Sequence, residues 1–125
     1  MAKNESPILV TGAAGFIGYS LVRELLLRGE NVVGIDNLND YYDVKLKYYR
    51  LNKLKKYKNF QFIKVDISNT IKLKSFFKNK KIDIICHLAA QAGVRYSLTN
   101  PRVYAKSNIN GFLEILEYCR YNPKT

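Results

Sequence analysis

A stretch of small residues, Thr11–Gly18, constrains this chain most strongly, because few folds need three glycines at intervals of three. It follows the short apolar run Ile8–Val10 and opens a helical pattern, which predicts a strand, a tight turn and a helix. Gly12 allows the turn, Gly15 lets backbone N–H groups approach a pyrophosphate, and Gly18 lets the helix pack close to the strand. A pyrophosphate would then lie at a helix N-terminus, where unpaired N–H groups and the helix dipole favour anions.

An acidic residue follows at the spacing that a dinucleotide site requires. The second predicted strand pattern, Val32–Ile35, ends at Asp36, which lies 18 residues after Gly18; dinucleotide sites place an acid about 20 residues after the glycines. A carboxylate accepts hydrogen bonds from ribose hydroxyls and repels a 2′-phosphate, so we expect NAD rather than NADP as the cofactor. The alternative interpretation is a strand-end Asp that only caps a turn.

The helix after the glycine turn is predicted to present one apolar face. Arg28 lies in its last turn, and Gly29 suits the position just past the helix end. The residues expected on the apolar face are Phe16, Ile17, Leu21, Val22, Leu25 and Leu26.

Strand and helix patterns alternate along the rest of the chain. The expected strands cover residues 8–11, 31–36, 60–65 and 82–88, and the later helices cover 44–57, 71–79 and 100–119. Asp43, residues 68–70 and Asn100 are the expected helix caps, and Pro101 suits a first turn. This order predicts an α/β fold: a Rossmann-type doubly wound parallel sheet in the order 3-2-1-4, truncated after about four strands. Residues 1–125 are expected to form a single domain.

The fourth predicted strand, Ile82–Leu88, is a nearly continuous apolar run of the kind found in strands buried on both faces. A loop is expected over residues 89–99. If no fifth strand follows, the fourth becomes an apolar sheet edge with unpaired N–H and C=O groups.

Composition excludes several classes of protein. No apolar run approaches the length of a membrane span, and the first residues lack the apolar core of a signal peptide. Cys86 and Cys119 lie inside apolar patterns, which indicates reduced thiols and a cytoplasmic protein with no metal site. The net charge of +11 comes largely from Lys45–Lys58 and Lys72–Lys81; we favour solvated helix faces over a nucleic-acid surface there.

Several segments together resemble the extended short-chain dehydrogenase family of NAD-dependent sugar-nucleotide epimerases and dehydratases. Two longer ones, Asp36–Lys47 and Gln91–Ser97, more narrowly resemble UDP-glucuronate 4-epimerases. The shorter segments are Val10–Gly18, Asp36–Leu38, Val65–Ile67 and His87–Ala90, and the likeness covers nearly all of the chain from about Ile8.

The resemblance implies a set of NAD-binding positions. Gly12, Gly15, Phe16 and Ile17 would bind the pyrophosphate, Asp36 and Asn37 the adenosine ribose, Asp66 and Ile67 the adenine ring, and Leu88, Ala89, Ala90 and Gln91 the nicotinamide half.

Two further positions carry open alternatives. Asn108 matches a helix Asn that contacts the cofactor, or is a helix polar residue that meets the loops of the sheet. Arg95 would bind a substrate phosphate or carboxylate, or is a solvated loop arginine.

Epimerases of this kind use a catalytic Tyr-x-x-x-Lys pair and a Ser or Thr, which in the family follow a fifth strand. The two local matches, Tyr41/Lys45 and Tyr49/Lys53, lie on the adenosine side, so we assign no catalytic residue. His87 is expected to be a packed or hydrogen-bonded strand-end residue. We therefore expect an NAD-binding, N-terminal part of a nucleotide-sugar epimerase that is inactive alone. The alternatives are half of a split epimerase that binds a UDP-sugar once a second chain completes it, and a non-catalytic dinucleotide-binding module.

Overall fold

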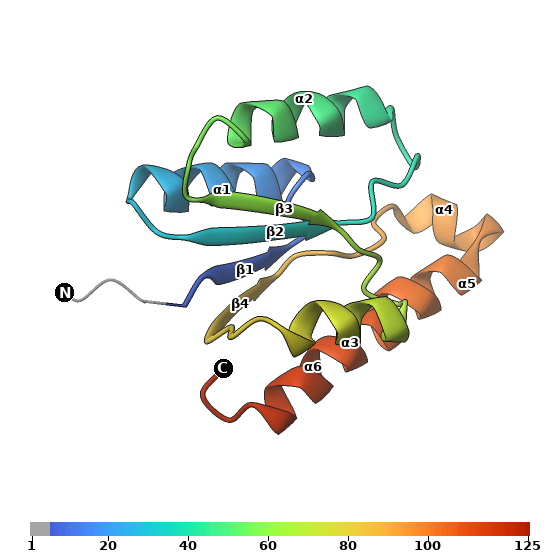
Figure 1. Cartoon of the computed structure of the whole chain (residues 1–125). Coiled ribbons are helices and arrows are strands. Elements are labelled where there is room, and N and C mark those ends of the chain that lie inside the picture. Colours follow the sequence, from blue (N-terminus) through green and yellow to red (C-terminus); the bar gives the residue numbers. More distant parts are fainter. Residues whose placement is uncertain (1–5) are drawn as a thin grey trace.

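The computed structural model describes residues 6–125. Its four strands, β1 (Ile8–Thr11), β2 (Val32–Asp36), β3 (Phe60–Lys64) and β4 (Ile84–His87), form one parallel sheet in the order β3-β2-β1-β4. The helices α1 (Phe16–Leu27) and α2 (Val44–Leu54) cover one face, and α3 (Thr70–Lys78) and α6 (Phe112–Tyr121) cover the other (Figure 1). The predicted fold class and strand order are confirmed.

The parallel register brings the carboxyl ends of all four strands to one edge of the sheet. Thr11 pairs with Ile35 and with His87, and Asp36 pairs with Lys64. In open sheets of this kind, ligands bind outside the carboxyl ends, where the chain connections change direction. Every predicted site segment therefore reaches the same end of the molecule.

Two apolar layers hold the helices on the sheet. One lies under α1 and contains Val10, Val22 and Leu54; the other lies under α3 and α6 and contains Leu9, Ile35, Leu73, Phe77 and Ile115. Strand residues alternate between these layers, because successive side chains of a strand point to opposite faces.

The glycine turn is as compact as its spacing predicts. Gly12 has a φ of +71°, a conformation that glycine adopts at little cost. A Cβ placed on Gly18 would lie inside contact distance of the Gly12 carbonyl oxygen and only 2.8 Å from its carbonyl carbon. Gly18 therefore lets α1 start directly against the turn.

The expected apolar face of α1 is only partly correct. Gly18, Val22 and Leu26 are buried, but Phe16 is 78% and Ile17 66% exposed. In the first turn of the helix these two side chains point to solvent.

The fourth strand is shorter than expected and lies at the edge of the sheet. It pairs only with β1 among the described strands, and Ile84 is 41% exposed. The prediction of burial on both faces is wrong for this chain, whereas the expected apolar edge is confirmed.

The segment after β4 is more helical than predicted. Residues 94–99, expected as a loop, form the helix α4 (Val94–Thr99), and α5 (Pro101–Tyr104) follows. Asn100 is the N-cap residue of α5, as expected, but its side chain makes no capping hydrogen bond; its amide donates to the Thr99 hydroxyl. The chain then widens into the π-helical segment η1 (Ala105–Gly111) before α6, where a regular helix was expected.

The remaining helix boundaries differ little from expectation. Helix α2 ends at Leu54 rather than near residue 57, and the side chains of Asp43 and Asn69 cap α2 and α3 as predicted. Both cysteines are free thiols. Across residues 6–125, no helix combines the length and the apolar character needed to cross a membrane.

Candidate functional site

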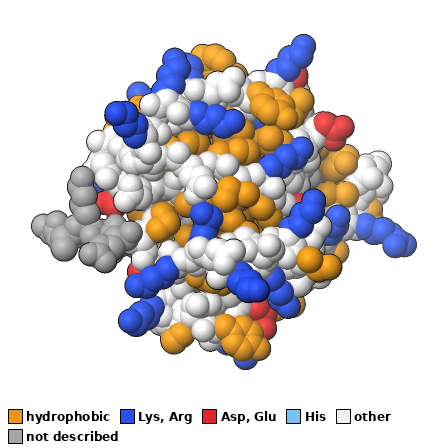
Figure 2. Space-filling view, in the orientation of Figure 1, with side chains coloured by type: hydrophobic (Ala, Val, Ile, Leu, Met, Phe, Trp, Pro, Cys, Tyr) orange, Lys and Arg blue, Asp and Glu red, His pale blue; other side chains and the backbone are white. Residues whose placement is uncertain are grey.

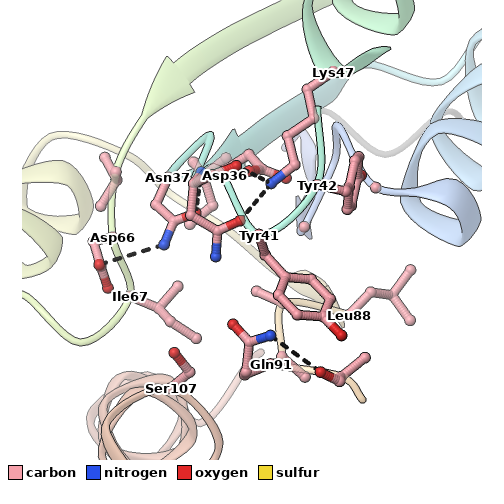
Figure 3. Close-up of a pocket in the computed structure, with 18 residues that line it drawn as sticks. Asp36, Asn37, Tyr41, Tyr42, Lys47, Asp66, Ile67, Leu88, Gln91 and Ser107 are labelled. Atoms are coloured by element: carbon pink, nitrogen blue, oxygen red, sulfur yellow. Dashed lines mark hydrogen bonds between the residues drawn. The ribbon is translucent and has the colours of Figure 1, made fainter. Parts of the chain in front are cut away.

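A cleft opens at the carboxyl edge of the sheet, between the glycine turn and the segments that follow β2, β3 and β4 (Figure 3). Every predicted cofactor residue except Phe16, Ile17 and Asn108 lines it. The cleft residues that had been predicted are Gly12, Gly15, Asp36, Asn37, Asp66, Ile67, Leu88, Ala89, Ala90 and Gln91; those that had not are Ile35, Asn39, Tyr41, Tyr42, Lys47, Val65, Ala92 and Ser107.

The start of α1 follows Gly15, which lines the cleft, and carries backbone N–H donors. Gly15 is its N-cap residue and supplies no side-chain acceptor to the first turn. The N–H groups of Phe16 and Ile17 lie in that first turn, where an α-helix provides no carbonyl partner. An anion at this position would accept these N–H groups, whichever way the two exposed side chains point.

Asp36 lies directly against the glycine turn, as its spacing predicts. Its carboxylate is buried and accepts hydrogen bonds from Ala14 N at 3.1 Å and from Leu38 N at 2.8 Å. These two hydrogen bonds are those of the alternative, an Asp that caps a turn. Each oxygen keeps a lone pair, because a carboxylate has about four acceptor positions, so the residue can do both.

Asn37 and Asp66 form the adjoining wall of the cleft. Asn37 Nδ2 donates to Asp66 Oδ2 at 3.4 Å, and Ser68 donates its N–H and its hydroxyl to Asp66 Oδ1 at 2.9 and 2.6 Å. Burial acts to raise the pKa of Asp66, but these hydrogen bonds outweigh it and lower the pKa below its usual value. Asp66 is therefore an ionised acceptor at neutral pH.

Thr11 joins β1 to the end of β4. Its hydroxyl oxygen accepts the N–H groups of Leu88 and Ala89, each at 3.0 Å, and lies 2.8 Å from His87 Nδ1. Because that oxygen already accepts twice, its own hydrogen goes to Nδ1, which leaves the imidazole neutral with its proton on Nε2.

His87 is a packed, hydrogen-bonded residue, as expected. Its ring stacks on Phe112 with 5.2 Å between the centroids. Burial lowers the pKa of His87, in keeping with the neutral form.

Asn108 holds the chain after β4 rather than lining the cleft. Its Oδ1 accepts from Gln91 N at 2.7 Å, and its Nδ2 donates to Gln91 O at 3.0 Å. This is the alternative of a helix polar residue that meets a loop of the sheet. Its neighbour Ser107, which sequence reasoning missed, lines the cleft instead.

Lys47 was also missed. Sequence reasoning placed it on a solvated face, yet it is only 5% exposed and reaches the cleft. The available signal was its spacing, because Lys47, Leu51 and Leu54 share the buried side of α2.

The remaining candidates lie outside the cleft or on its rim. Arg95 is exposed on α4 and does not line the cleft, and Lys53 packs its ammonium 4.6 Å from the centroid of the Tyr49 ring on the surface of α2. Tyr41 does line the cleft, where its ring lies 4.9 Å from that of Tyr96. No group of three or more potential metal ligands occurs in residues 6–125.

Comparisons with known proteins agree with this geometry. The family model described as GDP-mannose 4,6 dehydratase matches residues 9–125. A UDP-glucuronate 4-epimerase from Thermodesulfobacterium geofontis is 57% identical over 109 residues, which is 87% of this chain and 34% of the relative.

Solved structures extend the comparison. The UDP-glucuronic acid 4-epimerase of Bacillus cereus in complex with NAD has a TM-score of 0.80 and 39% identity, covering 92% of this chain and 36% of that one. A variant of that enzyme with UDP-4-deoxy-4-fluoro-glucuronic acid and NAD has a TM-score of 0.81 and 41% identity, covering 90% of this chain and 36% of that one.

The chain thus spans about a third of the length of the curated relatives that it matches. Within that span the family model covers the glycine turn, the acid after β2 and the whole segment after β4. The chain belongs to the GDP-mannose 4,6 dehydratase family.

Proposed function

We propose that this chain binds NAD in the cleft, as the cofactor-binding part of an enzyme similar to UDP-glucuronate 4-epimerases. One observation carries the proposal: the buried Asp36 carboxylate lies against the glycine turn, 3.1 Å from Ala14 N, with lone pairs left for a ribose. The NAD complex of the similar Bacillus cereus epimerase supports the choice of cofactor.

The residues fit the parts of a dinucleotide. The N–H groups of Phe16 and Ile17, beside Gly12 and Gly15, suit a pyrophosphate, and Asp36 with Asn37 suits the adenosine ribose. Asp66 and Ile67 border the adenine position, and Leu88, Ala89, Ala90 and Gln91 border the nicotinamide half. Asn108 acts in this scheme through the backbone of Gln91.

Bound NAD would supply a hydride acceptor and donor for a sugar carbon. This chain's residues would bind and orient the cofactor, and Arg95 would meet the phosphate or carboxylate of a UDP-sugar. We propose no turnover by the chain alone, since neither Tyr-x-x-x-Lys match provides a pair in the cleft: Lys45 is exposed on α2, and Lys53 lies against Tyr49. We also propose that residues 1–125 form a single NAD-binding domain. We further propose a cytoplasmic location, and the two free thiols support that location.

Titration calorimetry of the folded chain with NAD tests the proposal. We expect binding that Asp36→Asn weakens about 10-fold or more, the scale of one hydrogen bond to a charged group. Asp40→Asn, an exposed carboxylate in the same loop, is the matched control and should leave binding unchanged. A folded chain that gives no heat with NAD would refute the proposed function. UDP-galacturonate formed from UDP-glucuronate and NAD by the chain alone would refute the absence of turnover.

A second candidate is one half of a split epimerase. The observation that favours it is the outer side of β4, where Ile84 is 41% and Phe112 44% exposed beside an unpaired strand edge. A complementing chain should pair with this edge and carry a Tyr-x-x-x-Lys motif. Co-expression with the product of the adjacent coding sequence, followed by size-exclusion chromatography, tests this; two separate peaks would contradict it.

Nucleic acid is not a partner that we propose. On the face seen in Figure 2, Lys and Arg side chains are spread among apolar ones rather than gathered into one patch. Such a distribution is typical of solvated faces, and a phosphate-binding surface would concentrate its charge.

A further inference from the structure

Lys47 is the least expected residue of the cleft. Lysine is almost never fully buried unless its ammonium is paired, yet this side chain is 5% exposed and extends from α2 to the cleft. Figure 3 shows its ammonium near Asp36 and Asn37, over the part of the cleft that suits the adenosine ribose. Its position therefore calls for a partner other than bulk water.

The hydrogen bonds of Lys47 leave one N–H without an oxygen acceptor, although the ammonium also lies 4.8 Å from the centroid of the Tyr42 ring. An ammonium carries three N–H groups, and Lys47 Nζ donates to Asn39 O at 2.9 Å and to Asn39 Oδ1 at 2.7 Å. Both acceptors are neutral, and neither ion pair within 4.0 Å in residues 6–125 includes Lys47. The charge of Asp36 reaches it only through space. A third N–H therefore remains for a ligand in the cleft.

Asp36 alone can accept hydrogen bonds from the ribose hydroxyls but cannot donate any to their oxygens. Each ribose hydroxyl can donate one hydrogen bond and accept others, but an ionised carboxylate only accepts. Asp36 takes the N–H groups of Ala14 and Leu38 and retains lone pairs for a hydroxyl hydrogen. A donor on the same side of the cleft would complete the recognition of the hydroxyl oxygens.

We propose that Lys47 is a second ribose-binding residue of this cleft, donating its third N–H to an adenosine ribose hydroxyl whose hydrogen Asp36 accepts. This inference rests on the proposed function, because it takes NAD as the ligand. It assigns two tasks to one ammonium: two N–H groups hold the Asn39 loop, and the third recognises the ligand. Asp36 and Lys47 then form a matched acceptor and donor pair.

The test compares NAD with its 2′-deoxyadenosine and 3′-deoxyadenosine analogues by titration calorimetry. Lys47→Met keeps the length of the side chain and removes every donor. We expect this variant to weaken the binding of NAD about 10-fold or more. It should weaken the binding of one deoxy analogue far less, because that analogue lacks the hydroxyl to which Lys47 donates. Lys53→Met, an exposed lysine on the same helix, is the control and should change none of the three affinities.

The outcomes separate a binding role from a structural one. If Lys47 only holds the Asn39 loop, Lys47→Met lowers all three affinities by the same factor, and the proposal is overturned. Lys47→Leu, which also has no donor, replaces Lys47→Met in this comparison if circular dichroism shows that the latter is unfolded. Wild-type chain that fails to bind NAD refutes the proposed function itself, whereas equal losses in a chain that binds NAD refute only the role of Lys47.

Discussion

Replacing Gly18 with alanine tests whether the close approach of α1 to the glycine turn is essential. The new Cβ would overlap the Gly12 carbonyl oxygen and lie 2.8 Å from its carbon and 3.1 Å from Ala13 Cα. All three are backbone atoms, so no side-chain rotation can relieve the overlap. Overpacking of this kind costs about 1–3 kcal/mol, and more when the backbone must move.

A second effect acts in the opposite direction, because alanine stabilises a helix interior by about 1 kcal/mol relative to glycine. We therefore expect Gly18→Ala to lower the free energy of unfolding by about 2 kcal/mol, which corresponds to about 6–10 °C in Tm for a chain of this size. Thermal and urea denaturation followed by circular dichroism measure both quantities.

Gly15→Ala is the matched control for this experiment. A Cβ there meets only the Gly12 carbonyl oxygen, at 3.2 Å, and Gly15 has an ordinary φ of −73°. Its stability should stay within about 0.5 kcal/mol of wild type. Under the proposed function its affinity for NAD should fall, because a side chain at this glycine hinders the approach of the backbone to the pyrophosphate. A Gly18→Ala variant as stable as wild type would refute the argument from close packing.

Three further predictions concern the last residue of β4 and the segment after it. Asn108→Ala leaves Gln91 N and O without their partners, so we expect denaturation to show a loss of about 1–3 kcal/mol. Burial lowers the pKa of His87, so at a pH below about 6.5 the unfolded chain binds a proton that the native chain does not. Stability should therefore fall as pH drops from about 6.5 to 5, and His87→Gln should flatten that slope in urea titrations. Gly93 has a φ of +97°, and a Cβ there would meet the Tyr41 hydroxyl, so Gly93→Ala should lower the free energy of unfolding by about 1–3 kcal/mol. Adding Tyr41→Phe should restore only the part of this loss that comes from the contact with the hydroxyl. If thermal melts show that the double variant is as stable as Tyr41→Phe alone, the argument from backbone strain is wrong.

Local spacing was sufficient to predict the sheet and the centre of the site. The intervals between Gly12, Gly15, Gly18 and Asp36 depend only on how a strand, a turn and a helix succeed one another, and Asp36 lies where they place it. The strand order followed from alternation and the handedness of crossovers, which do not depend on side-chain detail.

The missed features depend on the surroundings of single side chains in the folded chain. Lys47 can be buried because Asn39 accepts two hydrogen bonds from its ammonium. The spacing along α2 indicates which side of the helix is buried, but no pattern of charge along the helix indicates this partner. The widened turn at η1 places Asn108 opposite Gln91, although a regular helix was predicted there. Phe16 and Ile17 followed the apolar spacing of α1 but lie in its first turn, where both side chains are exposed.

The two hydrogen bonds that Asp36 accepts within the chain give the carboxylate a role before any ligand arrives. By holding Ala14 and Leu38, it fixes the glycine turn and the loop after β2 in one arrangement during folding. The conformational entropy of both segments is then lost at that stage rather than on association. Under the proposed function, an incoming dinucleotide would meet a site that is already organised, so association should proceed without a slow rearrangement of this end of the molecule.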